Sequence, residues 1–178
     1  AGIGMVESHH GTYRGATIAP NGDVTPPIRG VPLDGTMNNL RIPDSDSGSM
    51  DSDGAVDRAM GPMQFIPDTW RLYGVDANNT GFASPDNIDD AALSAAGYLC
   101  YRGKDLSSPH GWMDALHAYN LSDDYARAVR DWATRLMKSL ATFCRPWVTR
   151  ARLSSIFCEV SMPARSTRLA ISLVVALR

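Results

Sequence analysis

A single glutamate ends an apolar stretch near the start of the 178-residue sequence, in the segment Gly2-Ile-Gly-Met-Val-Glu7. A carboxyl group at the edge of an apolar segment is a candidate for a raised pKa, because burial disfavours its charged form. A carboxyl group that keeps its proton near neutral pH is what general acid catalysis requires. Glu7 is therefore the first candidate catalytic residue, against the plainer interpretation that it is a solvated surface residue.

Polar groups that could assist such an acid lie in three later stretches, residues 58–67, 89–99 and 118–120. They are an amide, a phenol and a phenol–amide pair: Gln64, Tyr98, Tyr119 and Asn120. Amides and phenols can hold and orient a polar group of a substrate. Plainer interpretations stay open, because a glutamine can simply bond to backbone in its loop and buried tyrosines can be core residues with satisfied hydroxyls.

Helices are the elements that must position these groups. Apolar spacing, capping residues and prolines in the first turn predict where they lie. The expected helices are 2–10 closed by Gly11, a start within 56–65, one opening at Pro67, one capped by Asp86 or Asn87 and running to 99, one over 112–119, and one capped by Ser122-Asp123 and running to 136. Strand signals are nearly absent over 1–136, so the sequence predicts a mainly α fold with long loops.

Residues 11–56 show no apolar periodicity and are rich in glycine and proline. A loop of this length is usually functional, ligand-facing or disordered. Its acidic part, residues 44–57, has no glycine where a calcium-binding loop requires one. We therefore expect residues 44–57 to form a solvated loop.

Charge divides the chain into two parts. Residues 1–136 carry 18 Asp and Glu and 10 Lys and Arg, a net charge of -8, whereas residues 137–178 carry one acid and 7 basic residues, a net charge of +6. We expect a catalytic domain over 1–136 and a basic, apolar tail of unassigned role over 137–178. The acidic domain argues against nucleic acid as the main partner. The apolar run at 169–177 is too short to span a membrane.

Four motifs follow one another along the chain: Glu7-Ser8 is the first, and the stretches 58–67, 89–99 and 118–120 are the second, third and fourth. Together and in this order they resemble the lytic transglycosylases of bacterial cell walls. They look most like the membrane-bound lytic transglycosylase B type, in the form seen in secreted actinobacterial proteins. The resemblance covers about residues 2–135, and its most specific part is the long stretch 58–70. It implies a lysozyme-like α fold with a deep groove for a glycan strand.

The resemblance also implies a role for each motif residue. Glu7 matches the single catalytic acid/base of the family, and the substrate-binding positions are matched by Gln64, Tyr98, Tyr119 and Asn120. Neighbouring residues of the same motifs complete the expected substrate-binding set: Ser8, Met63 and Phe65. Protonated Glu7 would donate a proton to the leaving oxygen between N-acetylmuramic acid and N-acetylglucosamine. The resulting carboxylate would take a proton from the C6 hydroxyl as that oxygen closes a 1,6-anhydro ring.

This reaction requires neither water nor a second carboxylate, unlike hydrolysis by a pair of acids. Two other functions stay open. The chain could be a hydrolytic muramidase in which an aspartate of residues 44–57 positions water, or a non-catalytic peptidoglycan-binding remnant. In each case the expected partner is a peptidoglycan glycan strand.

Related sequences often carry a calcium-like loop after the second motif, and here Asp76-Ala-Asn-Asn-Thr-Gly81 keeps only some of its ligand types. Thr80 replaces an acid and no glutamate stands at position twelve, so we expect no metal site and no cofactor. Because the substrate lies outside the cytoplasmic membrane, we expect a secreted or wall-associated monomer. The sequence opens at Ala1 directly before the first motif, so we expect an N-terminally truncated domain without its export signal. In an oxidising compartment Cys100 could pair with either Cys144 or Cys158.

Overall fold

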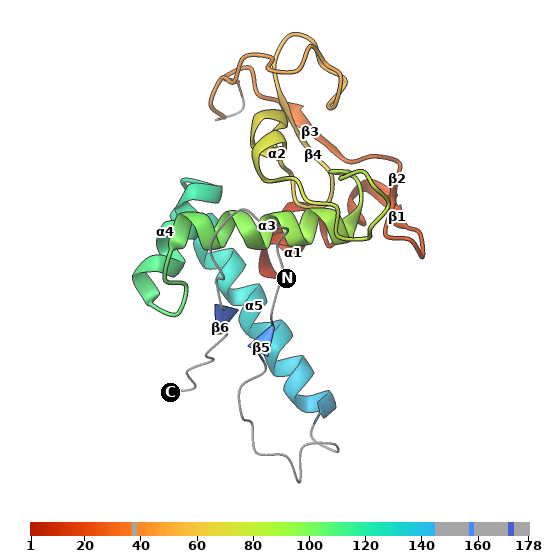
Figure 1. The fold of residues 1–178 in the computed structure, drawn as a ribbon. Coiled ribbons are helices and arrows are strands. Elements are labelled where there is room, and N and C mark those ends of the chain that lie inside the picture. The colour runs from red at the N-terminus through yellow and green to blue at the C-terminus, as the bar shows by residue number, and fades with distance from the viewer. Residues whose placement is uncertain (37–38, 145–156, 159–170, 173–178) are drawn as a thin grey trace.

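The computed structural model describes residues 1–36, 39–144, 157–158 and 171–172 (Figure 1). Helices dominate this part of the chain. They are α1 (Gly2–Ser8), α2 (Pro67–Tyr73), α3 (Ile88–Gly103), α4 (Pro109–Tyr119) and α5 (Asp123–Cys144), with a single 3-10 turn, η1, at Tyr13–Gly15. The mainly α fold expected from the sequence is confirmed for the described residues.

Two helix pairs form the frame of the molecule: α1 packs against α5, and α3 packs against α4. The approach of α1 to α5 is so close that a Cβ atom on Gly2 would lie 2.4 Å from the carbonyl oxygen of Val129. The core between these pairs includes small residues of α3 and α5, such as Ala91, Ala95 and Ala126. Small side chains at these positions let the backbones approach, which explains the alanine density of the sequence.

Two helix starts, those of α3 and α5, follow the capping signals of the sequence, whereas α4 begins at Pro109, three residues before its expected start. The side chain of Asn87 accepts hydrogen bonds from the backbone N–H groups of Asp89 and Asp90 at the start of α3. Asn87 is fully buried, and its amide nitrogen also donates to the carbonyl oxygen of Asn21 at 2.9 Å. This single side chain therefore caps the helix and ties an earlier loop to it.

Short strands replace some of the loop and helix that the sequence suggested. β1 (Thr17–Ile18) pairs antiparallel with β2 (Val24–Thr25), and β3 (Arg29–Pro32) pairs antiparallel with β4 (Arg58–Met60). A third antiparallel pair joins β5 (Phe157–Cys158) to β6 (Ile171–Ser172).

The helix start expected within 56–65 is wrong, because that segment holds β4 and a tight turn. The backbone N–H and carbonyl of Met60 both pair with Phe65, closing a turn that begins at Gly61. Gly61 has a φ of +69°, and a Cβ atom there would lie 1.7 Å from the carbonyl oxygen of Pro85. Only glycine fits this position, and the turn it permits overrides the helical propensity of its neighbours.

The expectation of a solvated loop at 44–57 is wrong for three of its acids, whereas residues such as Ser47 and Ala55 are exposed. Asp46, Asp51 and Asp57 are buried, with exposed fractions of 8%, 1% and 0%. The carboxylate of Asp57 accepts hydrogen bonds from the backbone N–H and the hydroxyl of Ser45, and that of Asp51 accepts from the backbone N–H of Arg58. The buried carboxylates accept hydrogen bonds from backbone N–H groups that have no partner in a helix or strand, and these bonds hold the irregular loop together.

The last helix continues beyond the end that the sequence suggested. α5 reaches Cys144 and therefore crosses the boundary at 136/137, so the division into two domains stays a prediction. Most of the expected tail, including most of the apolar run 169–177, lies outside the described residues. Within the described part, no helix is both long and apolar enough to cross a membrane. Cys100 is a half-buried free thiol, and the side chains of its two possible partners lie outside the described part.

Candidate active site

Glu7 lies in the last turn of α1, one residue before the helix ends. The helix closes at Ser8, because His9 adopts the left-handed conformation (φ 51°, ψ 47°) and the N–H groups of His9 and His10 return to the carbonyls of Met5 and Gly4. The expected cap at Gly11 is therefore displaced by two residues.

Ser8 fastens this turn to the second motif. It is 1% exposed, and its hydroxyl donates to the carbonyl oxygen of Pro62 at 2.7 Å while accepting from the N–H of Gly11 at 2.8 Å. The Ser8 hydroxyl is thus engaged inside the protein. Its contribution to the site is to fix the position of Glu7 relative to the turn at Gly61–Phe65.

Tyr125 on α5 supplies the direct partner of the candidate acid. Its hydroxyl donates a hydrogen bond to Oε1 of Glu7 at 2.6 Å, although 118 residues separate the two. Burial raises the pKa of Glu7 to about 7, and the hydrogen bond from Tyr125 opposes part of that rise. Burial and the nearby charge of Glu7 raise the pKa of Tyr125, so Tyr125 keeps its proton and acts only as a donor to the carboxylate.

Sequence reasoning did not single out Tyr125 as a site residue. In the sequence, Tyr125 falls on the periodic apolar face of the helix expected to end at residue 136, together with Ala128, Val129 and Trp132. The available signal was its phenol, because a tyrosine on the buried face of a helix needs a hydrogen-bond partner inside the protein.

Aromatic rings extend from this pair toward the second and third motifs. Tyr119 stacks on Tyr125 with ring centroids 6.4 Å apart and planes at 8°, and Tyr98 meets Tyr119 edge to face at 5.5 Å. Phe65 adds edge contacts to both Tyr98 and Tyr119. The Tyr119 hydroxyl donates to the carbonyl oxygen of Met63 at 2.7 Å, which joins the fourth motif to the second.

The structure therefore brings five of the sequence-predicted residues together around one aromatic cluster: Glu7, Met63, Phe65, Tyr98 and Tyr119. The hydroxyls of Tyr98 and Tyr119 both donate to backbone carbonyl groups. That of Tyr98 donates to the carbonyl oxygen of Ala118 at 2.6 Å, and that of Tyr119 to Met63. Each phenol oxygen still keeps lone pairs that can accept a hydrogen bond.

The two amides of the expected set make different contacts. Gln64 holds a φ of +53°, unusual for a residue with a side chain, and its amide nitrogen donates to the carbonyl oxygen of Gly61 at 2.8 Å. Asn120 is exposed at the end of α4 and accepts from the N–H of Ser122. Among the described residues, no hydrogen bond joins Gln64 or Asn120 to Glu7.

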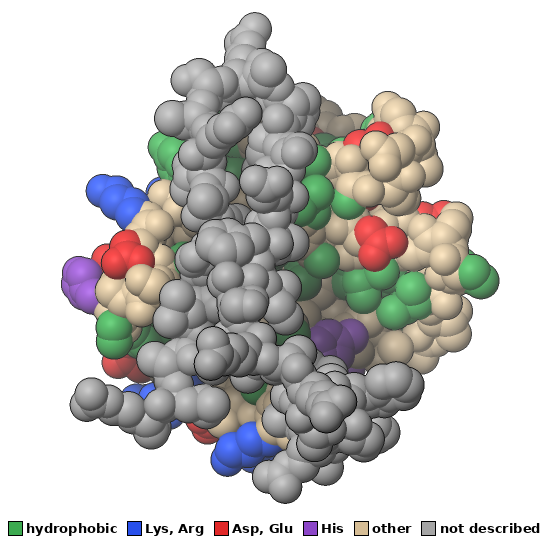
Figure 2. Space-filling view, turned by 60° about the horizontal axis from the view of Figure 1, so that its bottom comes forward, with side chains coloured by type: hydrophobic (Ala, Val, Ile, Leu, Met, Phe, Trp, Pro, Cys, Tyr) green, Lys and Arg blue, Asp and Glu red, His purple; other side chains and the backbone are tan. Residues whose placement is uncertain are grey.

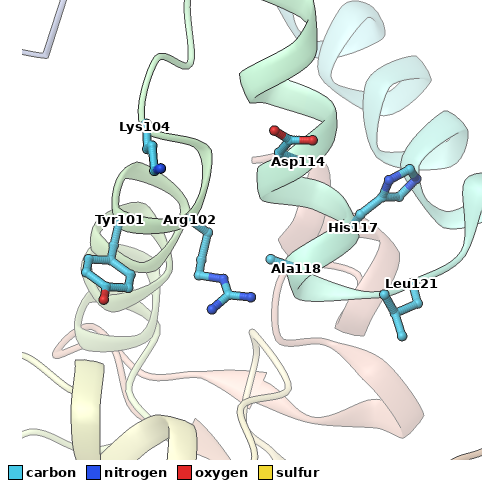
Figure 3. Close-up of a pocket in the computed structure, with 7 residues that line it drawn as sticks. All are labelled: Tyr101, Arg102, Lys104, Asp114, His117, Ala118 and Leu121. Carbon is cyan, nitrogen blue, oxygen red and sulfur yellow. The ribbon is translucent and has the colours of Figure 1, made fainter.

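The surface of the described residues has two hollows, and Glu7 lines neither. One, of about 400 Å³, is bounded by polar side chains of the 76–90 region and of the loop at Asn21 and Asp23. The other, of about 600 Å³, lies between the end of α3 and the length of α4 (Figure 3). It is lined by Tyr101, Arg102, Lys104, Asp114, His117, Ala118 and Leu121, and so shares its wall with the segment that carries Tyr119 and Asn120.

One cluster of carboxylates among the described residues has ligand atoms close enough to hold a metal: Asp44, Asp46 and Asp57 place oxygens within 4.8 Å of one another. In the calcium-like loop, Asp76 is the acid at the first position. Backbone N–H groups already occupy much of this capacity: Asp46 accepts from Met50 and Gly48, and Asp76 accepts from Thr80 and Gly81. Such contacts use the lone pairs that a cation would need.

Comparison with known families gives one match. Residues 34–113 match the family model described as the transglycosylase SLT domain. The matched segment contains the second and third motifs, and Glu7, Tyr119 and Tyr125 lie outside it. No curated protein and no solved structure shows significant similarity to the chain.

The match supports a lytic transglycosylase of the lysozyme-like superfamily, an enzyme class that acts on peptidoglycan outside the cytoplasmic membrane. The helices of the described residues, with their small pieces of strand, fit the mainly α fold of that superfamily.

Proposed function

We propose that the protein cleaves the β-1,4 bond between N-acetylmuramic acid and N-acetylglucosamine in peptidoglycan, forming a 1,6-anhydromuramoyl product. Glu7 is the single general acid/base of this reaction. The observation that carries the proposal is the half-buried Glu7 carboxyl group, whose pKa is raised to about 7 and which accepts a hydrogen bond from the Tyr125 hydroxyl.

A pKa near 7 suits both halves of the reaction, because each form of Glu7 is accessible near neutral pH. In the first half, the protonated carboxyl group gives its proton to the oxygen of the departing N-acetylglucosamine, and the bond from that oxygen to C1 of the muramoyl sugar breaks. The N-acetyl group of the muramoyl sugar assists by attacking C1. Amide and phenol groups such as Gln64, Asn120 and Tyr119 are proposed to orient it.

In the second half, the Glu7 carboxylate takes the proton of the C6 hydroxyl while O6 bonds to C1. The bond between C1 and the N-acetyl oxygen breaks, the anhydro ring closes, and Glu7 regains the proton it gave away. Tyr125 stabilises the carboxylate between the two steps, since a hydrogen bond to the charged form favours that form. The product forms without consumption of water.

The arrangement of acids favours this route over hydrolysis. A muramidase with two carboxyl groups would need an acid of residues 44–57 to face Glu7 across the scissile bond. The buried acids of that loop, Asp46, Asp51 and Asp57, are directed to backbone groups of their own loop, and the loop (orange to yellow, around β3 and β4) lies apart from α1 in Figure 1.

The proposal is tested by digesting purified peptidoglycan with the protein and weighing the soluble muropeptides by mass spectrometry. Anhydro products, lighter by one water than the hydrolytic ones, are expected. Products with reducing ends would instead establish a muramidase. Sedimentation of the protein with the wall without any cleavage would establish a binding protein.

A further inference from the structure

The hollow between α3 and α4 is lined by two cationic side chains, Arg102 and Lys104. Arg102 and Lys104 stand at the C-terminal end of α3, and no salt bridge among the described residues involves either one. Both residues are exposed. The Arg102 guanidinium extends from α3 toward α4, as Figure 3 shows.

Two further titratable side chains line this hollow from α4, and each lies close to a partner of opposite type. His117 of α4 bonds to Asp123 at 2.8 Å and so turns toward the start of α5. Asp114, on the opposite wall from Arg102, lies 3.3 Å from His110. The α3 wall of the hollow thus presents two cationic groups that form no salt bridge among the described residues, and the α4 wall presents a carboxylate close to His110.

Backbone packing holds the cationic wall in place. A Cβ atom on Gly103 would lie 2.5 Å from the carbonyl oxygen of Gly111 and 2.8 Å from Cβ of Ala115, so α3 ends in direct backbone contact with α4. Lys104 then adopts φ 55° and ψ -81°, a conformation that residues with side chains rarely occupy. The two basic side chains therefore project from a turn whose geometry is fixed by its neighbours rather than from a loose loop.

Two residues that line this hollow contact the aromatic cluster beside Glu7. The Arg102 guanidinium lies over the Tyr98 ring, 6.0 Å from its centroid, and the Tyr98 hydroxyl bonds to the carbonyl oxygen of Ala118 in the hollow wall. His117 and Ala118 directly precede Tyr119. A ligand in the hollow would therefore be adjacent to a sugar held at Tyr119.

We propose that the hollow binds the peptide branch of the peptidoglycan strand, with Arg102 and Lys104 holding one of its carboxylates; this inference rests on the proposed function. Every N-acetylmuramic acid carries its peptide through a lactyl group, so a cleavage site at this sugar has a peptide next to it. Peptide branches with free carboxylates match a guanidinium and an ammonium group, and the volume of about 600 Å³ accommodates a few residues.

The test compares cleavage of intact peptidoglycan with cleavage of the same glycan after an amidase has removed its peptides. The variant is Arg102→Gln/Lys104→Gln, and the control is Arg127→Gln/Arg130→Gln, which removes two exposed charges from α5. Exposed ion pairs are individually weak, so the wild type should prefer the peptide-bearing strand by about fivefold. The variant should lose that preference while cleaving the bare glycan at the wild-type rate, and the control should behave as the wild type.

A variant that keeps the full preference would overturn the inference. If no protein cleaves either strand, the proposed function fails, and calorimetric titration with a soluble N-acetylmuramoyl tripeptide bearing free carboxyl groups decides the inference separately. Binding to the wild type and control that weakens in the variant supports the peptide site. Equal binding by all three proteins, or no binding by any, rejects it.

Discussion

Two regions of the molecule shield carboxyl groups from water, but one region raises the pKa of its carboxyl group and the other lowers it. In the helical region, Glu7 is half-buried, and among the described residues the Tyr125 hydroxyl is the one group that donates to its carboxyl group. Burial therefore dominates and raises the pKa of Glu7 to about 7. In the acidic loop, burial alone would raise the pKa of Asp46, yet the backbone N–H groups of Met50 and Gly48 outweigh it and the pKa is lowered. The number of hydrogen-bond donors, rather than burial itself, decides whether a withdrawn carboxyl group keeps its proton.

The comparison assigns the two regions different work. A carboxyl group that keeps its proton can act as an acid, whereas one held charged by backbone donors stabilises an irregular chain. On this basis Glu7 is a candidate for chemistry and Asp46, Asp51 and Asp57 are candidates for structure. Each assignment predicts what substitution does.

The largest expected effect is the loss of cleavage in Glu7→Gln. Because the amide keeps the shape of the carboxyl group but cannot exchange the proton, the rate should fall by about 10²–10⁴-fold, the range for removal of a general acid/base. The melting temperature should stay at or above that of the wild type. Glu159, the one other glutamate of the sequence, provides the matched control as Glu159→Gln, which should retain activity. Full activity in Glu7→Gln would refute the role of Glu7.

The next effect is a pH-dependent difference in stability. The folded-state pKa of Glu7 is raised to about 7, so the unfolded chain releases this proton first as pH rises. The stability that Glu7 contributes is therefore fully present below about pH 4.5 and lost progressively up to about pH 7.

Urea unfolding of wild type and Glu7→Gln at pH 4 and pH 8 measures this difference. Between these values the wild type should lose about 2–4 kcal/mol of unfolding free energy relative to the variant. The pKa of Asp46 is lowered, so its contribution to stability has the opposite pH dependence and is lost as pH falls. The fall in unfolding free energy toward acid pH should therefore be smaller in Asp46→Asn than in the wild type. A difference between wild type and Glu7→Gln that does not change with pH would contradict the raised pKa.

The smallest expected effect is a loss of stability when a buried acid of the acidic loop is replaced. In Asp51→Asn the amide presents N–H groups to the backbone donors of Asp53 or Arg58, leaving a buried donor unpaired. The expected cost is about 1–3 kcal/mol of unfolding free energy. Asp68→Asn, at an exposed acid of α2, serves as the control and should change stability by less than about 0.5 kcal/mol. Cleavage by folded Asp51→Asn should match the wild type, and a selective loss of activity would place the acidic loop in the chemistry.

Local signals predicted the parts of the fold that depend on nearby residues. The cap at Asn87, the proline that opens α2 and the periodic face of α5 are each set within a few positions, and the structure confirms them. The turn at Gly61 was missed because its geometry depends on contact with Pro85. The burial of Asp46, Asp51 and Asp57 was missed because it depends on which backbone groups the folded loop leaves unpaired.

The candidate site divides in the same way. The chemical type of Glu7 and its apolar approach were visible in the sequence, and so were the tyrosines now found in one cluster with it. The partner that bonds to Glu7 was not visible, because only the packing of α1 against α5 brings Tyr125 to it. A pattern of residue types can thus indicate the acid, but the environment that sets its pKa comes from contacts across the whole domain.

The most direct test of the central claim is the pKa of Glu7 itself. The sequence contains only two glutamates, so protein labelled with ¹³C at the glutamate carboxyl carbon gives two signals, which Glu7→Gln assigns. Following both signals through a pH titration should give a pKa of about 7 for Glu7, and a higher value in Tyr125→Phe, because the hydrogen bond that opposes the rise is gone. A Glu7 pKa near 4.5, unchanged in Tyr125→Phe, would contradict the account of this residue as an acid poised near neutral pH.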